Sequence, residues 1–428
     1  MTSNTEQRTL RVAISGTGFA GDFTARVFQM IPHKNNVSIE LSGITSGHLG
    51  NARNFAGRYG VGAAFEQHRD MLEAVKPHID CIACANHAHA QYVLEAAEAG
   101  VPVIVLEKPP LIWPGYLDGR QADAAVRKAE SMDAFHEVLE AVEAAGSKLL
   151  YAENFVYLDG VRALVTLLRE AEPRDKGKIL LQQGVCAHQG SHAPAYDMPE
   201  KSGGGALLNK ACHPLGPALY LKQVEGILRE GAPVRPVKVA AAALQVLKRQ
   251  PHASGEHFRV MQNVDDYARI TVVFEDDTVA ELTGHDLSIS GIRNAFSVIA
   301  DFGQYDMRVN PSNAHELFLP DGDMAGDVLM REKLPTPQGT SFPSPMQFHT
   351  HGYVSEIDDA VRCALERERR PQSGAMLAWD TLAVLMAGYE SAEKDSRFID
   401  ISEYTLGRDF PPEVAPDPLL VDEVLQRT

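Results

Sequence analysis

A glycine-rich turn near the N-terminus constrains the fold more than any other feature of this chain. Gly16, Gly18 and Gly21 form a G-x-G-x-x-G pattern between a strand-like run at residues 10–15 and an amphipathic helical run. Gly16 permits a tight turn, Gly18 lets the backbone approach a pyrophosphate at the helix N-terminus, and Gly21 allows close helix–strand packing. The pattern predicts a dinucleotide-binding domain, with the cofactor contacts Gly16, Thr17, Gly18, Phe19 and Ala20.

The first part of the chain alternates strand-like and helix-like segments. Strands are expected near residues 11–15, 38–45, 81–85, 101–106 and 148–152, and helices near 18–30, 52–59, 89–99 and 133–145. Alternation of this kind is typical of a doubly wound parallel sheet. We therefore predict an α/β Rossmann domain over residues 1–150, with an inserted loop that contains a short helix at residues 110–130.

The pattern changes after residue 151. Strand-like stretches fall near residues 179–185, 237–246, 268–274, 279–282 and 296–301, and helical stretches near 353–365 and 375–394. Glu275-Asp276-Asp277 is a hairpin signal, whereas residues 303–345 are rich in Pro, Gly and Asn and are expected to be loops. These features predict an α+β domain over residues 151–428 with a large, mostly antiparallel open sheet.

A lysine stands at the end of an apolar run in Glu107-Lys108-Pro109. The run, Val101–Leu106, is expected to be a buried parallel strand. Pro109 favours an extended conformation at Lys108, which holds the lysine at the carboxyl end of the strand. Ligands bind at that edge of open α/β sheets, so Lys108 is a candidate functional residue.

Bulk composition excludes several classes of function. The formal net charge of −17 disfavours nucleic acid and anionic membranes as partners, and no apolar run approaches the length that spans a bilayer. Five cysteines, an odd number, indicate a reducing compartment, and we expect a cytoplasmic protein. Cys81 and Cys84 form a C-x-x-C within an apolar strand without a second pair, so neither a zinc site nor a redox site is expected there.

Several further motifs occur in a fixed order and identify a family. They are Asn86-His87-Ala88-His89, Glu107-Lys108-Pro109, Glu153-Asn154, Gly203-Gly204-Gly205-Ala206-Leu207, Cys212-His213-Pro214 and Gly352-Tyr353-Val354-Ser355-Glu356-Ile357. With the N-terminal glycine pattern, they make the chain resemble the Gfo/Idh/MocA family of oxidoreductases over nearly its whole length. The resemblance implies a Rossmann domain, a C-terminal α+β domain, and a homodimer or homotetramer formed through the open sheet.

The resemblance also implies catalytic roles. Oxidation of an alcohol by a nicotinamide requires a base for the hydroxyl proton, and histidine titrates near working pH. By resemblance His213 is this base and Lys108 is the second catalytic group, whose ammonium would steady a developing alkoxide. Asn209 departs from the family, which usually has Asp four residues before the histidine; on one helix its amide would share a face with His213. Gly216 likewise replaces the family's usual acid after the histidine.

Cofactor choice stays open between NAD and NADP. The second strand ends in hydroxyl residues, and alignment with the family puts Ser46 where an acidic residue would bind the ribose hydroxyl of NAD. The remaining cofactor contacts implied at strand ends are Asn86, His89, Glu107 and Lys108.

A second group of polar residues is expected on the substrate side: Asn154, His188, His192 and Lys210. His188 and His192, with Asp197, have the residue types of a metal site, but the ligand set is poorly defined. We therefore predict substrate contacts and no metal.

The sequence thus predicts an NAD(P)-dependent dehydrogenase acting on a hydroxyl or carbonyl of a sugar, cyclic polyol or sugar glycoside. One alternative is a glycoside-processing enzyme that recycles a tightly bound NAD within each turnover. The other is a non-catalytic dinucleotide-binding regulator, which Asn209 favours and which Lys108 and His213 oppose.

Overall fold

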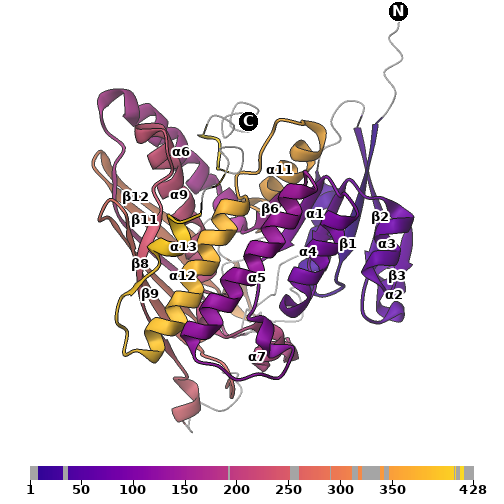
Figure 1. Cartoon of the computed structure of the whole chain (residues 1–428), viewed down its shortest axis with the longest axis horizontal. Helices are drawn as coiled ribbons and strands as arrows, with labels where there is room; N and C mark the ends of the chain where they lie inside the picture. Colours follow the sequence, from indigo (N-terminus) through magenta and orange to yellow (C-terminus); the bar gives the residue numbers. More distant parts are fainter. Residues whose placement is uncertain are drawn as a thin grey trace, which may run out of the picture.

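The two sheets of the molecule lie on opposite sides of a central pair of helices. This computed structural model describes residues 8–31, 37–190, 193–250, 260–289, 291–310, 317–320, 338–341, 347–408, 410 and 415–418. The central helices are α5 (Ala124–Ala144) and α12 (Ala375–Glu393), which pack against each other (Figure 1). No helix in the described ranges has the length and apolar character needed to cross a membrane.

The first sheet has six strands, all parallel, in the order β3-β2-β1-β4-β5-β6. They are β1 (Arg8–Ser15), β2 (Val37–Thr45), β3 (Ala63–Phe65), β4 (Ile79–Ile82), β5 (Val103–Glu107) and β6 (Lys148–Ala152). The order reverses between β1 and β4, which creates a crevice at their carboxyl ends. The predicted doubly wound Rossmann sheet is confirmed.

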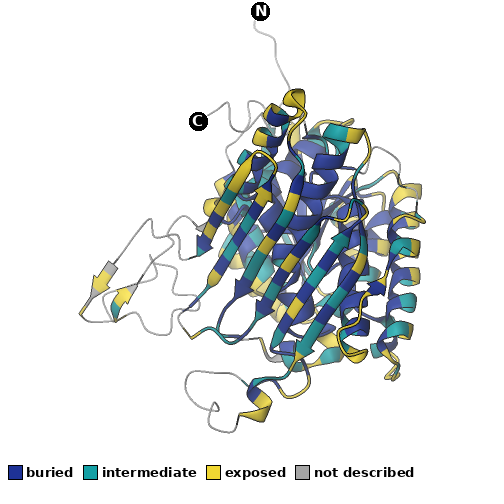
Figure 2. Cartoon of the chain, turned by 90° about the vertical axis from the view of Figure 1, so that its left-hand side faces the viewer, coloured by how far each residue is buried: buried dark blue, intermediate teal, exposed yellow. Residues whose placement is uncertain are grey.

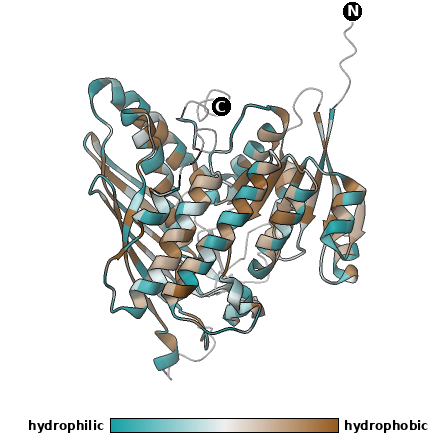
Figure 3. Cartoon of the chain, in the orientation of Figure 1, coloured by the Kyte–Doolittle hydropathy of each residue, from teal (hydrophilic) through white to brown (hydrophobic). Residues whose placement is uncertain are grey.

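Helices cover both faces of this sheet. They are α1 (Phe19–Met30), α2 (Leu49–Tyr59), α3 (His68–Val75), α4 (His89–Glu98) and α5. A C-terminal helix, α11 (Tyr353–Leu365), shares a core cluster with α1, where Ile357 and Val361 join Val27 and Phe28. Figure 3 shows hydrophobic and hydrophilic residues alternating along the outer helices, as expected for elements buried on one side. The β3–α3 unit lies in residues for which no element was predicted, and α5 begins earlier than expected, at Ala124.

The second sheet has seven strands in the order β12-β11-β7-β10-β9-β8-β15. They are β7 (Ile179–Ala187), β8 (Pro236–Leu244), β9 (Tyr267–Phe274), β10 (Val279–His285), β11 (Arg293–Ala300), β12 (Gly303–Asn310) and β15 (Ile399–Asp400). Only the β7–β10 pair is parallel, which confirms the mostly antiparallel prediction. Asp277 turns the expected β9–β10 hairpin with φ 62°, whereas β12 occupies residues expected to be a loop.

Helices cover one face of the second sheet. These helices are α6 (Asp159–Ala171), α9 (Cys212–Glu230) and α12. Along β9, Val272 and Phe274 are fully buried on the helix side, whereas Thr271 and Val273 alternate with them on the other face. Figure 2 shows this second face, where no described helix lies over the strands.

The remaining described elements are short. They are the α-helices α7 (Pro199–Ser202), α8 (Ala206–Asn209), α10 (Gln347–Thr350) and α13 (Ser402–Thr405), the hairpin strands β13 (Leu317–Leu319) and β14 (Gly339–Ser341), and 3-10 turns at Asn86–Ala88, Pro114–Tyr116, Asn154–Tyr157, Glu172–Arg174, Pro194–Asp197 and Leu247–Arg249.

Candidate active site

A cavity of about 590 Å³ opens at the carboxyl ends of β1 and β4, where the strand order reverses. Its walls come from the β1–α1 turn, from the ends of β4, β5 and β6, and from the C-terminal part of the chain. Most residues singled out from the sequence meet here. The cavity is lined by Gly16, Thr17, Gly18, Phe19, Ala20, Ser46, Asn86, Glu107, Lys108, Asn154, His188, Asn209, Lys210 and His213.

The glycine-rich turn has the geometry that its spacing predicts. Gly16 has φ 119°, and a Cβ there would lie 2.3 Å from the Ala83 carbonyl oxygen. A Cβ at Gly21 would lie 2.0 Å from the Gly16 carbonyl oxygen, so both positions require glycine. A Cβ at Gly18 would meet nothing within 4 Å, because this residue faces the cavity at the N-terminus of α1. The open cradle and the unsatisfied amides of the helix end fit a pyrophosphate.

Ser46 lies beside this turn, just after β2. Its hydroxyl accepts a hydrogen bond from Thr17 Oγ1 at 3.4 Å. The neighbouring wall residues from the same strand end are Thr45 and Gly47, neither of which carries a charge. The end of β2, where an acidic residue would bind the ribose hydroxyl of NAD, therefore carries no charge in this chain.

His89 is the predicted cofactor residue that the structure keeps out of the cavity wall. Its side chain is fully buried, and Nδ1 donates to the Pro109 carbonyl at 2.9 Å. Burial lowers the pKa of His89 to about 4, so the ring is neutral and holds the segment after Lys108 in place. The physical reason is that both ring nitrogens lie at backbone carbonyls, those of Pro109 and Cys84, rather than at the cavity.

Lys108 sits in a group of acidic side chains. Burial opposes protonation of its amine, but nearby anionic groups, Glu107 and Glu153 among them, outweigh this and raise the pKa of Lys108. Burial raises the pKa of Glu107 to about 7, although the Lys108 ammonium opposes the shift. Lys108 is therefore held as a cation at the cavity wall.

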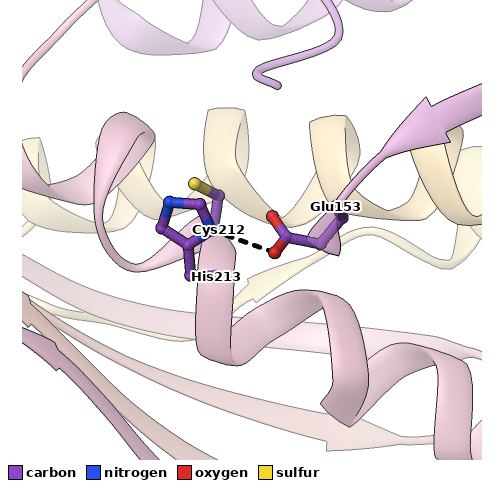
Figure 4. Close-up of side chains that lie close together, drawn as sticks. All are labelled: Glu153, Cys212 and His213. Carbon is purple, nitrogen blue, oxygen red and sulfur yellow. Dashed lines mark hydrogen bonds and ion pairs between the residues drawn. The ribbon is translucent and has the colours of Figure 1, made fainter. Parts of the chain in front are cut away.

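The imidazole of His213 pairs with a carboxylate that the sequence did not single out for this role. His213 Nδ1 lies 2.9 Å from Glu153 Oε1, and Figure 4 shows the two side chains pointing at each other. Glu153 follows β6, is fully buried, and accepts a further hydrogen bond from the Phe155 amide at 3.3 Å. The Phe155 ring stacks on the imidazole at 5.1 Å between centroids. Burial raises the pKa of Glu153 well above its usual range, whereas the Phe155 amide and the Lys108 ammonium oppose the shift.

Asn209 lines the cavity but turns its amide away from His213. Asn209 Nδ2 donates to the Gly204 carbonyl at 2.7 Å, and Oδ1 accepts from Asn86 Nδ2 at 3.3 Å. The expected shared helix face does not exist, because α8 ends at Asn209 and α9 begins at Cys212. At Lys210, between them, the backbone leaves the helical region with φ −121°. Asn209 thus fixes the glycine-rich segment before α8 rather than the imidazole.

The predicted substrate residues fall into two places. Asn154 Nδ2 donates to the His351 carbonyl at 2.7 Å, which ties the end of β6 to the segment before α11. Lys210 Nζ lies 3.7 Å from Asp286 Oδ1, and His188 Nδ1 lies 3.8 Å from the same oxygen. His192 lies outside the described residues. Asp197 accepts backbone hydrogen bonds from Gln262 and Asn263, so it does not join His188 in a ligand set.

The sequence assigned no role to Glu153, which pairs with His213, nor to the cavity residues His351 and Glu356. His351 is buried, and burial together with the nearby charge of His213 lowers its pKa to about 4. Glu356 lies on α11, and burial raises the pKa of its carboxyl well above the usual range. Among the described residues, His351 Nε2 and Glu356 Oε2 have no hydrogen-bond partner. Glu153-Asn154 and Gly352–Ile357 signalled these places only through the family resemblance.

One group of potential metal ligands occurs in the described part of the chain. One ligand atom each of Glu153, Cys212 and His213 lies within 4.8 Å of the others (Figure 4). Burial raises the pKa of the Cys212 thiol even though the Lys108 cation opposes this. Glu153 already pairs with His213, and the three residues offer only one ligand atom each. We treat the group as a hydrogen-bonded pair with a neighbouring thiol.

Comparison with known proteins gives one family for the N-terminal part. Residues 10–138 match the model of the GFO_IDH_MocA oxidoreductase family, which has an NAD-binding Rossmann fold. A 105-residue stretch is 32% identical to the D-glucoside 3-dehydrogenase of Escherichia coli (strain K12). That match covers 24% of this chain and only 28% of the relative.

Solved structures extend the likeness to most of the chain. GenD2 from gentamicin A biosynthesis, crystallised with NAD, superposes with a TM-score of 0.72 at 18% identity, covering 92% of this chain and 96% of that one. The scyllo-inositol dehydrogenase of Lactobacillus casei, with bound NAD(H) and scyllo-inositol, gives a TM-score of 0.67 at 16% identity, covering 92% of this chain and 100% of that one. At these identities the likeness establishes the two-domain fold.

Proposed function

We propose that this chain, whose residues 10–138 match the Gfo/Idh/MocA family model, is an NAD(P)-dependent dehydrogenase of that family that acts on a hydroxyl or carbonyl group of a sugar, cyclic polyol or sugar glycoside. One observation carries the proposal: the glycine cradle, Lys108 and His213 line the same cavity. A nucleotide-binding turn and an acid–base pair in one cavity fit hydride transfer. The names of the similar proteins, which act on glucosides and inositols, support a carbohydrate-like substrate.

In this proposal the N-terminal wall holds the dinucleotide. Gly18 and the N-terminus of α1 receive the pyrophosphate, and Ser46 meets the adenosine ribose. Because Ser46 carries no charge, the wall offers no repulsion to a 2′-phosphate, and we propose that both NAD and NADP are accepted. Asn86 and Glu107, at the ends of neighbouring strands, face the nicotinamide half. The bound nicotinamide supplies the hydride acceptor or donor.

The protein's own side chains move the proton. His213 accepts the substrate's hydroxyl proton at Nε2, because Nδ1 faces Glu153. Lys108 places an ammonium beside the oxygen that becomes negative, and so lowers the hydroxyl pKa. Asn154, His188 and Lys210 contact the other substrate groups, with His351 Nε2 as a further candidate. In the reverse direction His213 returns the proton to a carbonyl oxygen.

The proposal includes the assembly and the organisation of the chain. We place the division between the nucleotide-binding and substrate domains near residue 150, after β6. The uncovered face of the second sheet exposes Ile299 and Leu180 to 37% and 47%, respectively, and we propose that a second copy covers this face in a homodimer or homotetramer. Val272, Phe274 and Leu282 face the helices instead and contribute to the core.

All five cysteines are free thiols, which supports a location in the cytoplasm.

Two measurements test the proposed function. Mass spectrometry of the purified protein identifies any retained nucleotide, and a panel of glycosides and cyclic polyols is then screened with NAD⁺ and NADP⁺ for reduced nicotinamide. A dehydrogenase accumulates reduced cofactor in proportion to product. Product formation without reduced cofactor would point to internally recycled NAD, and nucleotide binding without any turnover would point to a regulator. A protein that binds neither nucleotide would overturn the proposal.

A further inference from the structure

The contact between Glu153 and His213 joins two distant parts of the chain. Glu153 directly follows β6 of the first sheet, and His213 lies in the first turn of α9, which covers the second sheet. The Nδ1–Oε1 distance of 2.9 Å is that of a direct hydrogen bond. Since Glu153 is fully buried and also receives the Phe155 amide, its carboxylate is fixed before any ligand binds.

A glycine on α9 makes room for this carboxylate. Gly216 lies three residues after His213, and a Cβ there would come within 2.3 Å of Glu153 Cγ and 3.2 Å of Cδ. No L-side chain fits at this position while Glu153 stays in place. Glycine inside a helix is less stable than most other residues. Its presence at position 216 is therefore explained by the room that the Glu153 side chain needs, and not by helix formation.

We propose that Glu153 is the positioning residue for His213, and that Gly216 is the matching gap in α9 that admits its side chain. This inference rests on the proposed function, in which His213 is the base. Glu153 orients the ring so that Nδ1 donates to the carboxylate and Nε2 receives the substrate proton. Asn209 does not take this role, because its amide is bound to Gly204 and Asn86.

Several ionisable side chains surround the Glu153–His213 pair. The ionisable groups that meet it are Lys108 and Glu107 from the end of β5, Cys212 on α9, His351, and Glu356 on α11. When Glu153 is ionised, its charge at hydrogen-bond distance from Nδ1 favours the imidazolium over the neutral ring. In Glu153→Gln this preference for the imidazolium is lost.

The test compares Glu153→Gln with the wild type in two measurements. Histidine-selective NMR titration, with His213→Ala used to assign the resonance, reports the pKa of the ring without any substrate. The pH–rate profile reports the same group during alcohol oxidation. We expect the ring pKa and the rising limb of the profile to move to lower pH in Glu153→Gln. We also expect kcat to fall roughly 10²–10⁴-fold with a much smaller change in KM.

Gly216→Ala provides a second, independent variant. Its methyl group displaces Glu153 while Glu153 and His213 both remain, so it should reproduce the shift of the profile in part. Gly57→Ala on α2 is the matched control, since a Cβ at Gly57 meets nothing within 4 Å and lies away from the cavity. Asn209→Asp should leave the midpoint of the profile unchanged, because this side chain faces Gly204.

Three results would overturn the inference. The first is a ring pKa and profile unmoved in Glu153→Gln while His213→Ala is inactive; the proposed function would then stand without this positioning residue. The second is full activity of His213→Ala, which contradicts the proposed function itself. The third is a stoichiometric divalent metal in the purified protein that is lost in both Glu153→Gln and Cys212→Ala, which would make the pair part of a metal site.

Discussion

In the proposed function, the two walls of the cavity recognise their ligands by different means. The N-terminal wall relies on backbone: a glycine turn, an open cradle at Gly18 and the amides of one helix end. The opposite wall relies on side chains brought together from β6, α9 and the segment before α11. Binding through backbone amides requires open space and depends little on the chemistry of the side chains. Binding through side chains depends on the position and charge of individual atoms. Substitutions in the two walls should therefore fail in different ways.

After the His213 and Glu153 variants, the largest effect is expected at Lys108. Lys108→Ala removes the cation beside the reacting oxygen, so turnover should fall roughly 10²–10³-fold, the usual cost of losing one group that stabilises a developing oxyanion. Cofactor affinity should change far less. Steady-state kinetics with a nicotinamide fluorescence titration measure both. An unchanged kcat would remove Lys108 from the mechanism and leave it a structural cation that balances Glu107 and Glu153.

The backbone wall should lose binding rather than chemistry. In Gly18→Val the new side chain enters the open cradle without a clash inside the protein, since a Cβ there meets nothing within 4 Å. The dissociation constant of the dinucleotide should rise roughly 10-fold or more, a change of about 1.4 kcal/mol. Gly18→Ala should give a smaller rise, and the melting temperature of both variants should stay near that of the wild type. Equal affinity in wild type and Gly18→Val would contradict the placement of the pyrophosphate.

The sequence predicted the backbone wall well because its signals are local. Strand, glycines and helix are adjacent in the chain, and their spacing alone fixes the turn at Gly16. The pairing of Glu153 with His213 spans 60 residues, so no periodicity or spacing points to it. Gly216 marks the space for Glu153, but a glycine in a helix indicates a close approach without naming the partner.

Other differences from the sequence-based expectations also have physical causes. Asn209 and His213 were expected on one helix, but the backbone break at Lys210 separates them into α8 and α9. The polar strand β12 pairs only with β11 at the sheet edge, and so it lacks the apolar alternation of a half-buried strand. His89 was expected to contact the cofactor, but its Nδ1 donates to the Pro109 carbonyl instead.

A smaller effect is expected where the backbone wall does use a side chain. Ser46→Asp places a carboxylate at the end of β2, which accepts a ribose hydroxyl but repels a 2′-phosphate. The ratio of NADP to NAD affinity should fall roughly 10-fold. Titration with both cofactors measures the ratio, and Ser46→Ala is the neutral control. If the ratio stays the same in Ser46→Asp, the adenosine ribose does not lie at Ser46.

The smallest expected effect is on stability and concerns Glu107. Its folded-state pKa of about 7 lies above the usual value for a glutamate, so the folded protein binds this proton more tightly than the unfolded chain does. The resulting stabilisation is present at low pH and is lost as the pH rises through about 7. Glu107→Gln, which cannot ionise, should lose less stability than the wild type between pH about 5 and about 8. Melting temperatures across this range test the sign, and parallel curves would contradict the shifted pKa.

The central claim is that one wall binds the dinucleotide while the other performs the chemistry. The most direct test is a single-turnover measurement of nicotinamide reduction by His213→Ala at saturating cofactor, with the cofactor dissociation constant taken from the same titration. The account predicts reduction roughly 10²–10⁴-fold slower than in the wild type, with an unchanged dissociation constant. Reduction at the wild-type rate would contradict it, since the base would then lie elsewhere in the cavity.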